Sequence, residues 1–380
     1  MTRYAHITGW GMAVPERVMT NDDLSKLVDT NDEWIRSRTG IKERRIAGVK
    51  ETTTTLAVEA AQRALEVANI LPSEVDLVIV ATSSAEYIFP ATASLVQDAI
   101  GAEKAGAFDL YAACTGFVYA LNVASQAVRT GSSNTVLVIG AETMSRLVDW
   151  KDRGTCILFG DGAGAFVVQG SDTPGGILSS IMRSDGSGGD TLYVESYGRP
   201  RASGVGGLLN YAIYMDGKEV FRFATRIMAS VTKEAVAAAG LTLQDINIII
   251  PHQANRRIIE AAARGLDLPE EKFMINIEKY GNTSSASIPI AVCEAVECGK
   301  LKPNDRVVFV GFGAGLTWGA MAVHWDATPP PPLTTWQQIT RRVQVGLAHA
   351  RSYVRRGVRK VESRLLGSEE PTEKTPPAKK

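Results

Sequence analysis

The chain has 380 residues, of which 45% are hydrophobic, and its 41 Lys and Arg residues balance 41 Asp and Glu residues. This composition excludes overall disorder, and no apolar run reaches the roughly 20 residues that a membrane-spanning helix needs. The N-terminus has no signal-peptide pattern, and the four cysteines form neither a CxxC pair nor a zinc-ligand spacing. We therefore expect a reduced cytoplasmic enzyme without a metal site.

The neutral total conceals an uneven distribution of charge. Residues 327–380 contain 11 basic and 4 acidic residues, a net charge of +7, so the residues before them carry −7. A proline run at 329–332 separates the two parts, and such a run neither continues a sheet nor starts a helix. The sequence therefore predicts an acidic body over 1–326 and a basic tail over 327–380.

Helix and strand patterns alternate along the body. Residues 54–70 are rich in Ala and Leu at helical spacing, and the threonines before them can cap a helix. Residues 75–82 are mostly apolar and β-branched, as expected for a strand buried on both faces. This alternation predicts an α/β fold with helices packed on a largely parallel sheet.

The same series of elements occurs twice. Residues 108–128 align with 275–296, each as a short strand, a turn of small residues and a helix. The flanking segments also correspond in order: 74–83 with 245–254, 134–142 with 305–313, and 159–169 with 313–325, the last pair each a glycine turn followed by a strand. We therefore expect two halves, roughly 1–175 and 176–326, whose equivalent turns face each other.

Three polar residues follow the ends of predicted strands. Cys114 directly precedes a predicted helix over 116–129, and a helix N-terminus stabilises a thiolate, so this residue is a candidate nucleophile. His252 follows an apolar run, and Asn282 lies in the turn equivalent to that of Cys114. Active sites of α/β folds form at such strand ends. The alternatives are a buried structural cysteine and a packed histidine.

Two glycine-rich segments, 160–164 and 311–315, superficially resemble nucleotide-binding loops. A phosphate-binding loop needs a helix N-terminus directly after the glycines, whereas strand patterns follow both segments. We interpret them as places where the backbone closely approaches the site.

Several motifs in the body resemble those of one enzyme family. They are NDEWIRSRTGIKERR, AACTGFVYAL, DRGTCILFGDGAGA, PHQANRRI, GNTSSASIP and GFGAGLTWG. Over residues 1–326 the chain is similar to β-ketoacyl-acyl-carrier-protein (ACP) synthase III, the condensing enzyme that initiates type II fatty-acid synthesis. This resemblance implies a thiolase-like α/β fold with duplicated halves in five αβαβα layers, usually in a homodimer.

The resemblance also implies a mechanism. Cys114 would accept the acyl group of an acyl-CoA, with acetyl-CoA as the expected primer, and the backbone N–H groups of Cys114 and Ala314 would form the oxyanion hole. Many family members have glycine at the position of Ala314, but alanine supplies the same N–H if its φ is negative. His252 and Asn282 would stabilise the enolate formed from malonyl-ACP by loss of CO2. The product is 3-oxoacyl-ACP, and no cofactor is needed.

Binding residues follow from the same resemblance. The residues expected to bind CoA are Thr30, Trp34, Arg38, Arg153, Phe221 and Asn255. Phe89 would limit the acyl pocket across the dimer interface. Docking of the acidic ACP is expected on Arg222, Arg256, Arg257 and Arg264. The alternatives are an ordinary packed tryptophan and a solvated arginine cluster. The expected partners are ACP, acyl-CoA and a second copy of the chain, without nucleic acid.

The tail contains a further helical pattern over 334–366. Apolar residues recur at intervals of three and four, at Ile339, Val343, Leu347, Ala350, Val354, Val358, Val361 and Leu365. Basic residues occupy the other faces, at Arg341, Arg342, Arg351, Arg355, Arg356, Arg359 and Lys360. A C-terminal basic amphipathic helix is therefore predicted, although Gly346 and Gly357 weaken it. It would bind an anionic membrane surface or a partner, or pack on its own dimer. Residues 367–380 have a disordered composition.

Other functions remain as alternatives. A related condensing enzyme that makes polyketide starters or ketones from acyl-CoAs would not need the arginine cluster. A Cys–His–Asn hydrolase would release a free acid, and a non-enzymatic scaffold acting through its tail would not need Cys114. The joint presence of Cys114, His252 and Asn282 favours the initiating synthase.

Overall fold

Two mixed β-sheets form the centre of the molecule. The computed structural model describes residues 2–195, 212–327, 336, 343, 346–347, 350–355, 357–359 and 361–362. The first sheet has the order β1 (Tyr4–Ala13), β7 (Asp161–Ser171), β6 (Thr135–Thr143), β4 (Leu77–Ala81) and β5 (Gly106–Leu110). The second has the order β8 (Gly176–Ser184), β13 (Thr317–Trp325), β12 (Asp305–Gly313) and β11 (Ile248–Pro251).

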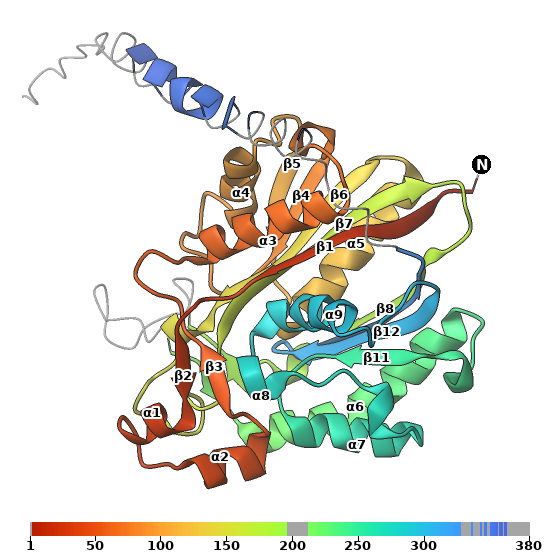
Figure 1. The fold of residues 1–380 in the computed structure, drawn as a ribbon. Coiled ribbons are helices and arrows are strands. Elements are labelled where there is room, and N and C mark those ends of the chain that lie inside the picture. The colour runs from red at the N-terminus through yellow and green to blue at the C-terminus, as the bar shows by residue number, and fades with distance from the viewer. Residues whose placement is uncertain are drawn as a thin grey trace, which may run out of the picture.

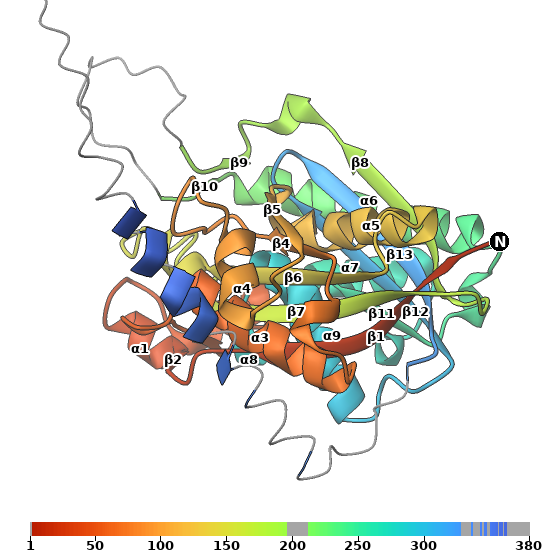
Figure 2. The same cartoon turned by 90° about the horizontal axis from the view of Figure 1, so that it is seen from above.

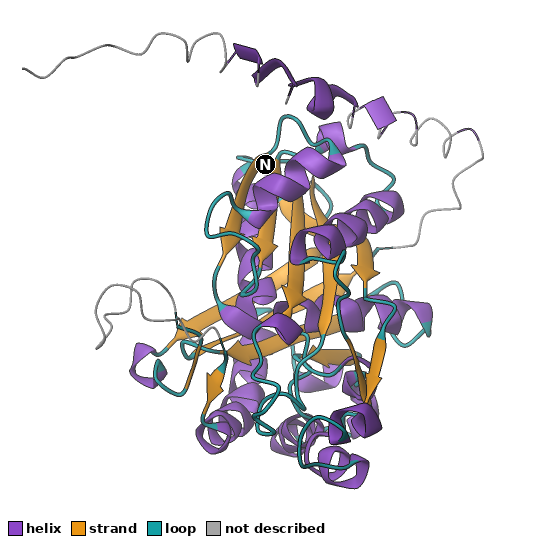
Figure 3. Cartoon of the chain, turned by 90° about the vertical axis from the view of Figure 1, so that its left-hand side faces the viewer, coloured by secondary structure: helices purple, strands orange, loops and turns teal. Residues whose placement is uncertain are grey.

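Helices cover both sheets and fill the space between them (Figure 1). Helices α3 (Thr53–Val67) and α4 (Thr92–Ile100) pack on the outer face of the first sheet. Helices α5 (Gly116–Thr130) and α9 (Ser287–Glu297) contact strands of both sheets, and α6 (Gly217–Ala238) and α7 (Arg256–Leu266) cover the second sheet. Figure 3 shows the strands in the interior of the body, with helices around them.

An aromatic core joins the two sheets through the middle helices. Phe117 of α5, Phe166 of β7 and Phe309 of β12 are fully buried, and the ring centroid of Phe166 lies 5.0 Å from that of Phe117 and 6.0 Å from that of Phe309. Burial of three phenylalanines is a large apolar contribution to stability. The sheets are therefore held at a fixed separation, which positions the turns at their ends.

The prediction of a largely parallel sheet was wrong. β4 pairs in parallel with β5 and β6, and β11 with β12, but β7 and β13 pair antiparallel with both of their neighbours. The connection from β12 to β13 explains part of this, because a turn of three residues joins only antiparallel strands. The alternation of helices and strands in the sequence concealed these returning strands.

Many predicted elements were placed well. Strand β12 has the bounds 305–313 that the sequence predicts, and α5 begins at the predicted residue. Helix α3 is capped by Thr52, as the threonine run suggested, and its end is followed by Asn69 at φ 52°. A left-handed residue stops a helix, so α3 is shorter than the predicted 54–70.

Two predictions for the repeated elements need correction. The strand expected near residue 275 is reduced to one bridge between Ile249 and Phe273. Gly162 and Gly164 lie within strand β7 and not in a turn. Because they have no side chains, helix α9 can pack closely against the sheet at these positions. A Cβ atom at Gly164 would lie 2.6 Å from Cβ of Pro289 in that helix. In the second glycine segment, the turn is confined to residues 314–316.

A smaller group of elements lies at one end of the body. The hairpin of β2 (Val18–Thr20) and β3 (Glu43–Arg45) carries α1 (Asn21–Ser25) and α2 (Asp32–Thr39), and β3 contacts α8 (Ile277–Tyr280). Strands β9 (Leu192–Tyr193) and β10 (Tyr214–Met215) form a further two-stranded antiparallel sheet (Figure 2). The first group brings α2 beside α7 and the residues that follow His252.

The tail forms a helical segment beside α4 (Figure 2). Every tail residue that the structure describes from 343 to 362 is helical, in agreement with the predicted helix. The predicted positions Ile339, Arg341, Arg342, Arg356, Lys360 and Leu365 lie outside the described residues. None of the helices described is both long and apolar enough to cross a membrane.

Candidate active site

Cys114 lies in a tight turn between β5 and α5. The turn is a 3₁₀ segment, Ala113–Thr115, and Ala113 has a φ of 46°. A residue with a Cβ atom is strained in this left-handed region by about 1–2 kcal/mol, which is typical of sites where geometry serves function. Cys114 is 8% exposed and sits at the N-terminus of α5, as the sequence predicted.

The end of strand β12 lies directly against this turn. A Cβ atom at Gly313 would lie 2.8 Å from the backbone N of Cys114 and 3.2 Å from that of Thr115. Such a distance is too short for any side chain, so glycine is required there. The interpretation of the second glycine segment as a close approach to the site is confirmed.

Ala314 follows Gly313 and is joined to the same turn. The Thr317 hydroxyl lies 3.0 Å from the carbonyl oxygen of Ala314 and 3.2 Å from that of Ala112. Ala314 is not among the described residues with positive φ, so the condition for alanine at this position is met. The backbone of Ala314 therefore lies close to the nucleophile turn.

His252 comes from the end of β11 and lies near Cys114. A Cβ atom at Gly311 would be 3.8 Å from both the Cys114 carbonyl oxygen and the His252 Cβ, so the two residues flank this glycine. The Phe312 ring packs edge-on against the imidazole, with ring centroids 5.3 Å apart. His252 is 1% exposed, and this burial lowers its pKa to about 3. The imidazole is therefore neutral at physiological pH.

The Ser287 hydroxyl contacts one ring nitrogen of this imidazole. Its Oγ lies 2.6 Å from Nδ1 of His252 and accepts a 3.4 Å hydrogen bond from the backbone N–H of Gln253. The Ser287 hydroxyl has one hydrogen to donate and a second lone pair, so this contact fits either ring tautomer. When Ser287 donates to Nδ1, the neutral ring carries its proton on Nε2 and presents that N–H as a donor.

Asn282 is held in the turn before α9. Its Oδ1 accepts a 2.8 Å hydrogen bond from the backbone N–H of Ser284, so its amide hydrogens remain available as donors. Backbone hydrogen bonds to Leu158 and from Gly160 fix the residue itself. This turn contacts the Cys114 turn, so the structure brings Cys114, His252 and Asn282 together.

Burial acts on the protonation of the Cys114 thiol. Burial raises the pKa of Cys114 to about 12, a hydrogen bond with Ser284 opposes the rise, and the charge of Glu142 adds to it. Desolvation therefore opposes the stabilisation of a thiolate that the helix N-terminus provides.

Residues that the sequence did not identify support the site. Ser284 and Ser287 contact Cys114 and His252, and buried Glu142 of β6 accepts hydrogen bonds from Ser84, after β4, and from Ser285, before α9. Burial raises the pKa of Glu142. The serines belong to the GNTSSAS motif, but nothing in their spacing separates them from ordinary turn residues.

The predicted CoA-binding residues form a group around α2. The guanidinium carbons of Arg38 and Arg153 lie 4.8 Å and 5.3 Å from the centroid of the half-buried Trp34. Nδ2 of Asn255 donates a 3.0 Å hydrogen bond to the Arg38 carbonyl. The buried Oγ1 of Thr30 has no hydrogen-bond partner among the described residues. Phe221 lies apart from this group, on α6.

The predicted docking arginines lie on α6 and α7. Arg257 is exposed and stacks on Phe221, with its guanidinium carbon 5.2 Å from the ring centroid. Arg264 is also exposed, whereas Arg222 pairs with Glu219, and Arg256 pairs with Glu260 and Glu270. Arg256 is therefore already neutralised by its neighbours.

The side chain of Phe89, the residue expected to limit the acyl pocket, is 84% exposed in the single chain. Tyr87, Ile88 and Tyr111 are exposed in the same region, next to the edge strand β5. Within the described residues, no group of three or more His, Cys, Asp and Glu side chains could hold a metal ion.

Comparison with known proteins identifies the family. Models described as 3-oxoacyl-[acyl-carrier-protein (ACP)] synthase III and its C-terminal part match residues 108–186 and 236–325. The chain is 51% identical to the β-ketoacyl-[acyl-carrier-protein] synthase III of Clostridium acetobutylicum over 320 residues, 84% of this chain and 98% of the relative.

Solved structures agree with the sequence comparison. The 3-oxoacyl-[acyl-carrier-protein] synthase III of Aquifex aeolicus is 48% identical with a TM-score of 0.79, covering 84% of this chain and 99% of that one. The priming β-ketosynthase of the R1128 polyketide pathway is 38% identical with a TM-score of 0.80, covering 87% and 98%. The fold is therefore the mixed α/β thiolase-like fold, and the chain belongs to the β-ketoacyl-ACP synthase III family of condensing acyltransferases.

Proposed function

We propose that this enzyme initiates type II fatty-acid synthesis by condensing an acyl-CoA, with acetyl-CoA as the expected primer, with malonyl-ACP. The observation that carries the proposal is the convergence of Cys114, His252 and Asn282 at the ends of neighbouring elements of the two halves. Nucleophile and hydrogen-bond donors are then available in one buried site. The thioester substrates supply the chemical driving force, so no cofactor is needed.

In the first step, Cys114 attacks the carbonyl carbon of the acyl-CoA. The Sγ–C bond forms, the C–S bond to CoA breaks, and the thiol proton leaves with the CoA sulfur. Negative charge on the carbonyl oxygen is stabilised by the backbone N–H groups of Cys114 and Ala314. The contact of Gly313 with the Cys114 backbone supports this arrangement, because it brings the residue before Ala314 against that N–H.

In the second step, malonyl-ACP loses CO2. Nε2–H of His252 and the amide of Asn282 donate hydrogen bonds to the thioester oxygen, on which the enolate charge develops. Preorganised donors in a buried site stabilise such charge by about 3 kcal/mol each. The enolate carbon attacks the acyl group, releasing 3-oxoacyl-ACP, and the Cys114 thiolate takes up one proton. Ser287 acts as a positioning residue because it keeps the proton of His252 on Nε2.

We infer that CoA is bound at the group around α2. The ring of Trp34 and the guanidinium of Arg153 provide stacking surfaces for adenine, and Arg38 provides charge for the phosphates. The unpartnered Thr30 hydroxyl supports a ligand contact at the same place. Asn255 lies between this group and His252, where it can contact the pantetheine arm, and Phe221 borders the route from α6.

ACP is proposed to dock on α6 and α7. Arg257 and Arg264 are exposed and seven residues apart on α7, hence on one face, and Arg222 extends the surface on α6. The ion pairs of Arg256 with Glu260 and Glu270 make its contribution the smallest of the four. Attraction to an acidic carrier protein would be strongest at low ionic strength.

We propose that the body consists of two duplicated halves, 1–175 and 176–326, forming the five αβαβα layers. The orders β1-β7-β6-β4 and β8-β13-β12-β11 correspond strand by strand, with the same parallel and antiparallel pairings. Ala113 and Ser284 occupy equivalent positions in the two turns and have φ values of 46° and 49°. Such agreement in backbone strain supports a common origin.

A homodimer is also proposed. Strand β5 is an edge strand, and exposed apolar side chains surround it, at Tyr87, Ile88, Phe89, Phe108 and Tyr111. An unpaired edge with an apolar patch favours association, and Phe89 would then reach the acyl pocket of the second copy. The free cysteines Cys114, Cys156, Cys293 and Cys298 are consistent with a cytoplasmic location.

A second candidate function is the formation of polyketide starters or ketones from acyl-CoAs. The likeness to the R1128 priming β-ketosynthase favours it. The two functions are separated by incubating the enzyme with acetyl-CoA and either malonyl-ACP or malonyl-CoA, and measuring 3-oxoacyl product by mass spectrometry. We expect product mainly with malonyl-ACP, none with Cys114→Ala, and a higher KM for malonyl-ACP with Arg257→Glu. Equal rates with malonyl-CoA and no effect of Arg257→Glu would refute the ACP-dependent function.

A further inference from the structure

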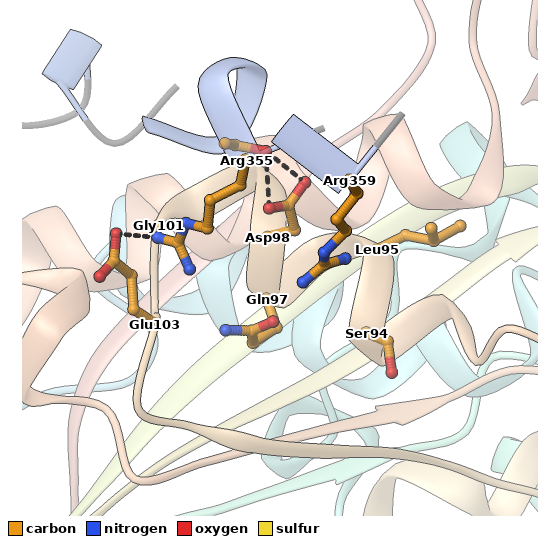
Figure 4. A pocket seen from close by; sticks show the side chains of 9 residues that line it. Ser94, Leu95, Gln97, Asp98, Gly101, Glu103, Arg355 and Arg359 are labelled. Carbon is orange, nitrogen blue, oxygen red and sulfur yellow. Dashed lines mark hydrogen bonds and ion pairs between the residues drawn. The ribbon is translucent and has the colours of Figure 1, made fainter. Parts of the chain in front are cut away.

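The C-terminal helical segment contacts the body through its polar side. The Ser352 hydroxyl lies 2.7 Å and 2.8 Å from the two carboxylate oxygens of Asp98 in α4, and Arg355 pairs with Glu103. Figure 4 shows Arg355 and Arg359 extending from the segment toward α4. Ser352 is the one buried residue among the tail residues described.

The apolar residues of the segment lie on the opposite side. Ser352 and Val354 are two residues apart, hence separated by about 160° around a helix axis. The apolar stripe is 49–61% exposed, at Val343, Leu347, Val354, Val358 and Val361. A row of aliphatic side chains on a helix is normally buried against another surface. In this segment, however, the polar side is the one that contacts the body.

We propose that this apolar stripe inserts into the interface of an anionic lipid bilayer and anchors the enzyme to the membrane surface. An amphipathic helix with aliphatic residues on one face and arginines on the others binds lipid in this way. Tyr353, which is 80% exposed at the edge of the stripe, suits the headgroup region. Exposed Arg351 flanks the other edge and attracts acidic headgroups.

Charge distinguishes a lipid surface from a second copy of the chain. Residues 327–380 carry a net charge of +7, so two such tails packed along their stripes would repel each other. A bilayer containing acidic lipid has the complementary sign. The contacts of Ser352 and Arg355 with α4 then hold the body at the membrane, with the stripe directed away from it.

The test is flotation of the full-length protein with vesicles of phosphatidylcholine alone or with about 30% phosphatidylglycerol. We expect binding to the anionic vesicles only. Val354→Asp should reduce the bound fraction by about tenfold or more, because a charge is placed in the stripe. Lys302→Gln, at an exposed position of the body, makes the same change of net charge outside the tail and should leave binding within about twofold.

Several outcomes would overturn the proposal. They are no binding to anionic vesicles, equal binding to both vesicle types, or equal losses in Val354→Asp and Lys302→Gln, which would indicate net charge alone. Loss of an interaction with an acidic protein such as ACP in Val354→Asp, without vesicle binding, would assign the stripe to a protein partner instead. Condensation with soluble substrates should be unchanged in both variants, which shows that they fold. A chain ending at residue 327 should remain active and fail to float.

Discussion

Ser287→Ala tests whether the orientation of His252 is needed for one half-reaction only. The substitution removes the hydroxyl that lies 2.6 Å from Nδ1 of His252 and 3.4 Å from the backbone nitrogen of Gln253, in a buried environment. A buried polar group left without its partner costs about 1–3 kcal/mol. The proton of the imidazole can then occupy Nδ1, which removes the donor on Nε2. Decarboxylation of malonyl-ACP should therefore slow by roughly 5- to 150-fold.

The two half-reactions are measured separately. Release of CO2 from malonyl-ACP reports the step that uses His252, and acylation by acetyl-CoA, followed by intact mass, reports the step that uses Cys114. Acylation should stay within about twofold of the unchanged enzyme, since the oxyanion hole is formed by backbone groups. Ser230→Ala, on the exposed surface of α6, is the control. Equal loss in both half-reactions, or no loss in either, would refute the role given to Ser287.

Three further predictions follow from other contacts. Gly313→Ala should abolish acylation, because its Cβ would lie 2.8 Å from the Cys114 nitrogen. Gly186→Ala, where no atom lies within 4 Å of the added Cβ, should leave the acylation rate unchanged. Normal acylation in both variants would contradict the close approach of Gly313 to Cys114. His6 and Asp326 are 2.6 Å apart, and the hydrogen bond to Asp326 raises the pKa of His6 above 6.5, so the pair stabilises the fold below that pH and loses its effect as the pH rises through the raised pKa. Substitution of that aspartate by asparagine should therefore lower Tm near pH 6 by a few degrees and by less near pH 9, and an equal effect at both would exclude the ion pair. Trp34→Ala should raise the KM for acetyl-CoA by about tenfold and leave the KM for malonyl-ACP unchanged, since stacking on the ring is worth about 1–2 kcal/mol.

The sequence was most informative where one residue type has few alternative uses. A cysteine before a helix, a histidine after an apolar strand and an asparagine in the equivalent turn identified the three residues that the structure brings together. Strand β12 and the start of α5 were also predicted well, because β-branched runs and small-residue turns have strong local preferences.

The remainder depends on contacts between distant residues. Ser287 resembles any serine at the start of a helix until it is placed 2.6 Å from His252, 35 residues away. The strand character of Gly162 and Gly164 follows from the close packing of α9, which no local pattern reveals. Burial likewise raises the pKa of Cys114, against the thiolate stabilisation that its position before a helix suggested. The periodicity of the tail predicted a helix, but the side that contacts α4 could not be chosen without the positions of Asp98 and Glu103.

Formation of an acyl-enzyme on Cys114 is the central claim, and intact mass tests it most directly. The purified protein is incubated with acetyl-CoA in the absence of malonyl-ACP, beside Cys114→Ala. We predict that the protein gains the mass of one acetyl group, that this group is lost on addition of malonyl-ACP with formation of 3-oxoacyl-ACP, and that the variant gains nothing. Absence of an adduct with acetyl-CoA and with longer or branched acyl-CoAs, or an adduct that persists in Cys114→Ala, would contradict the account.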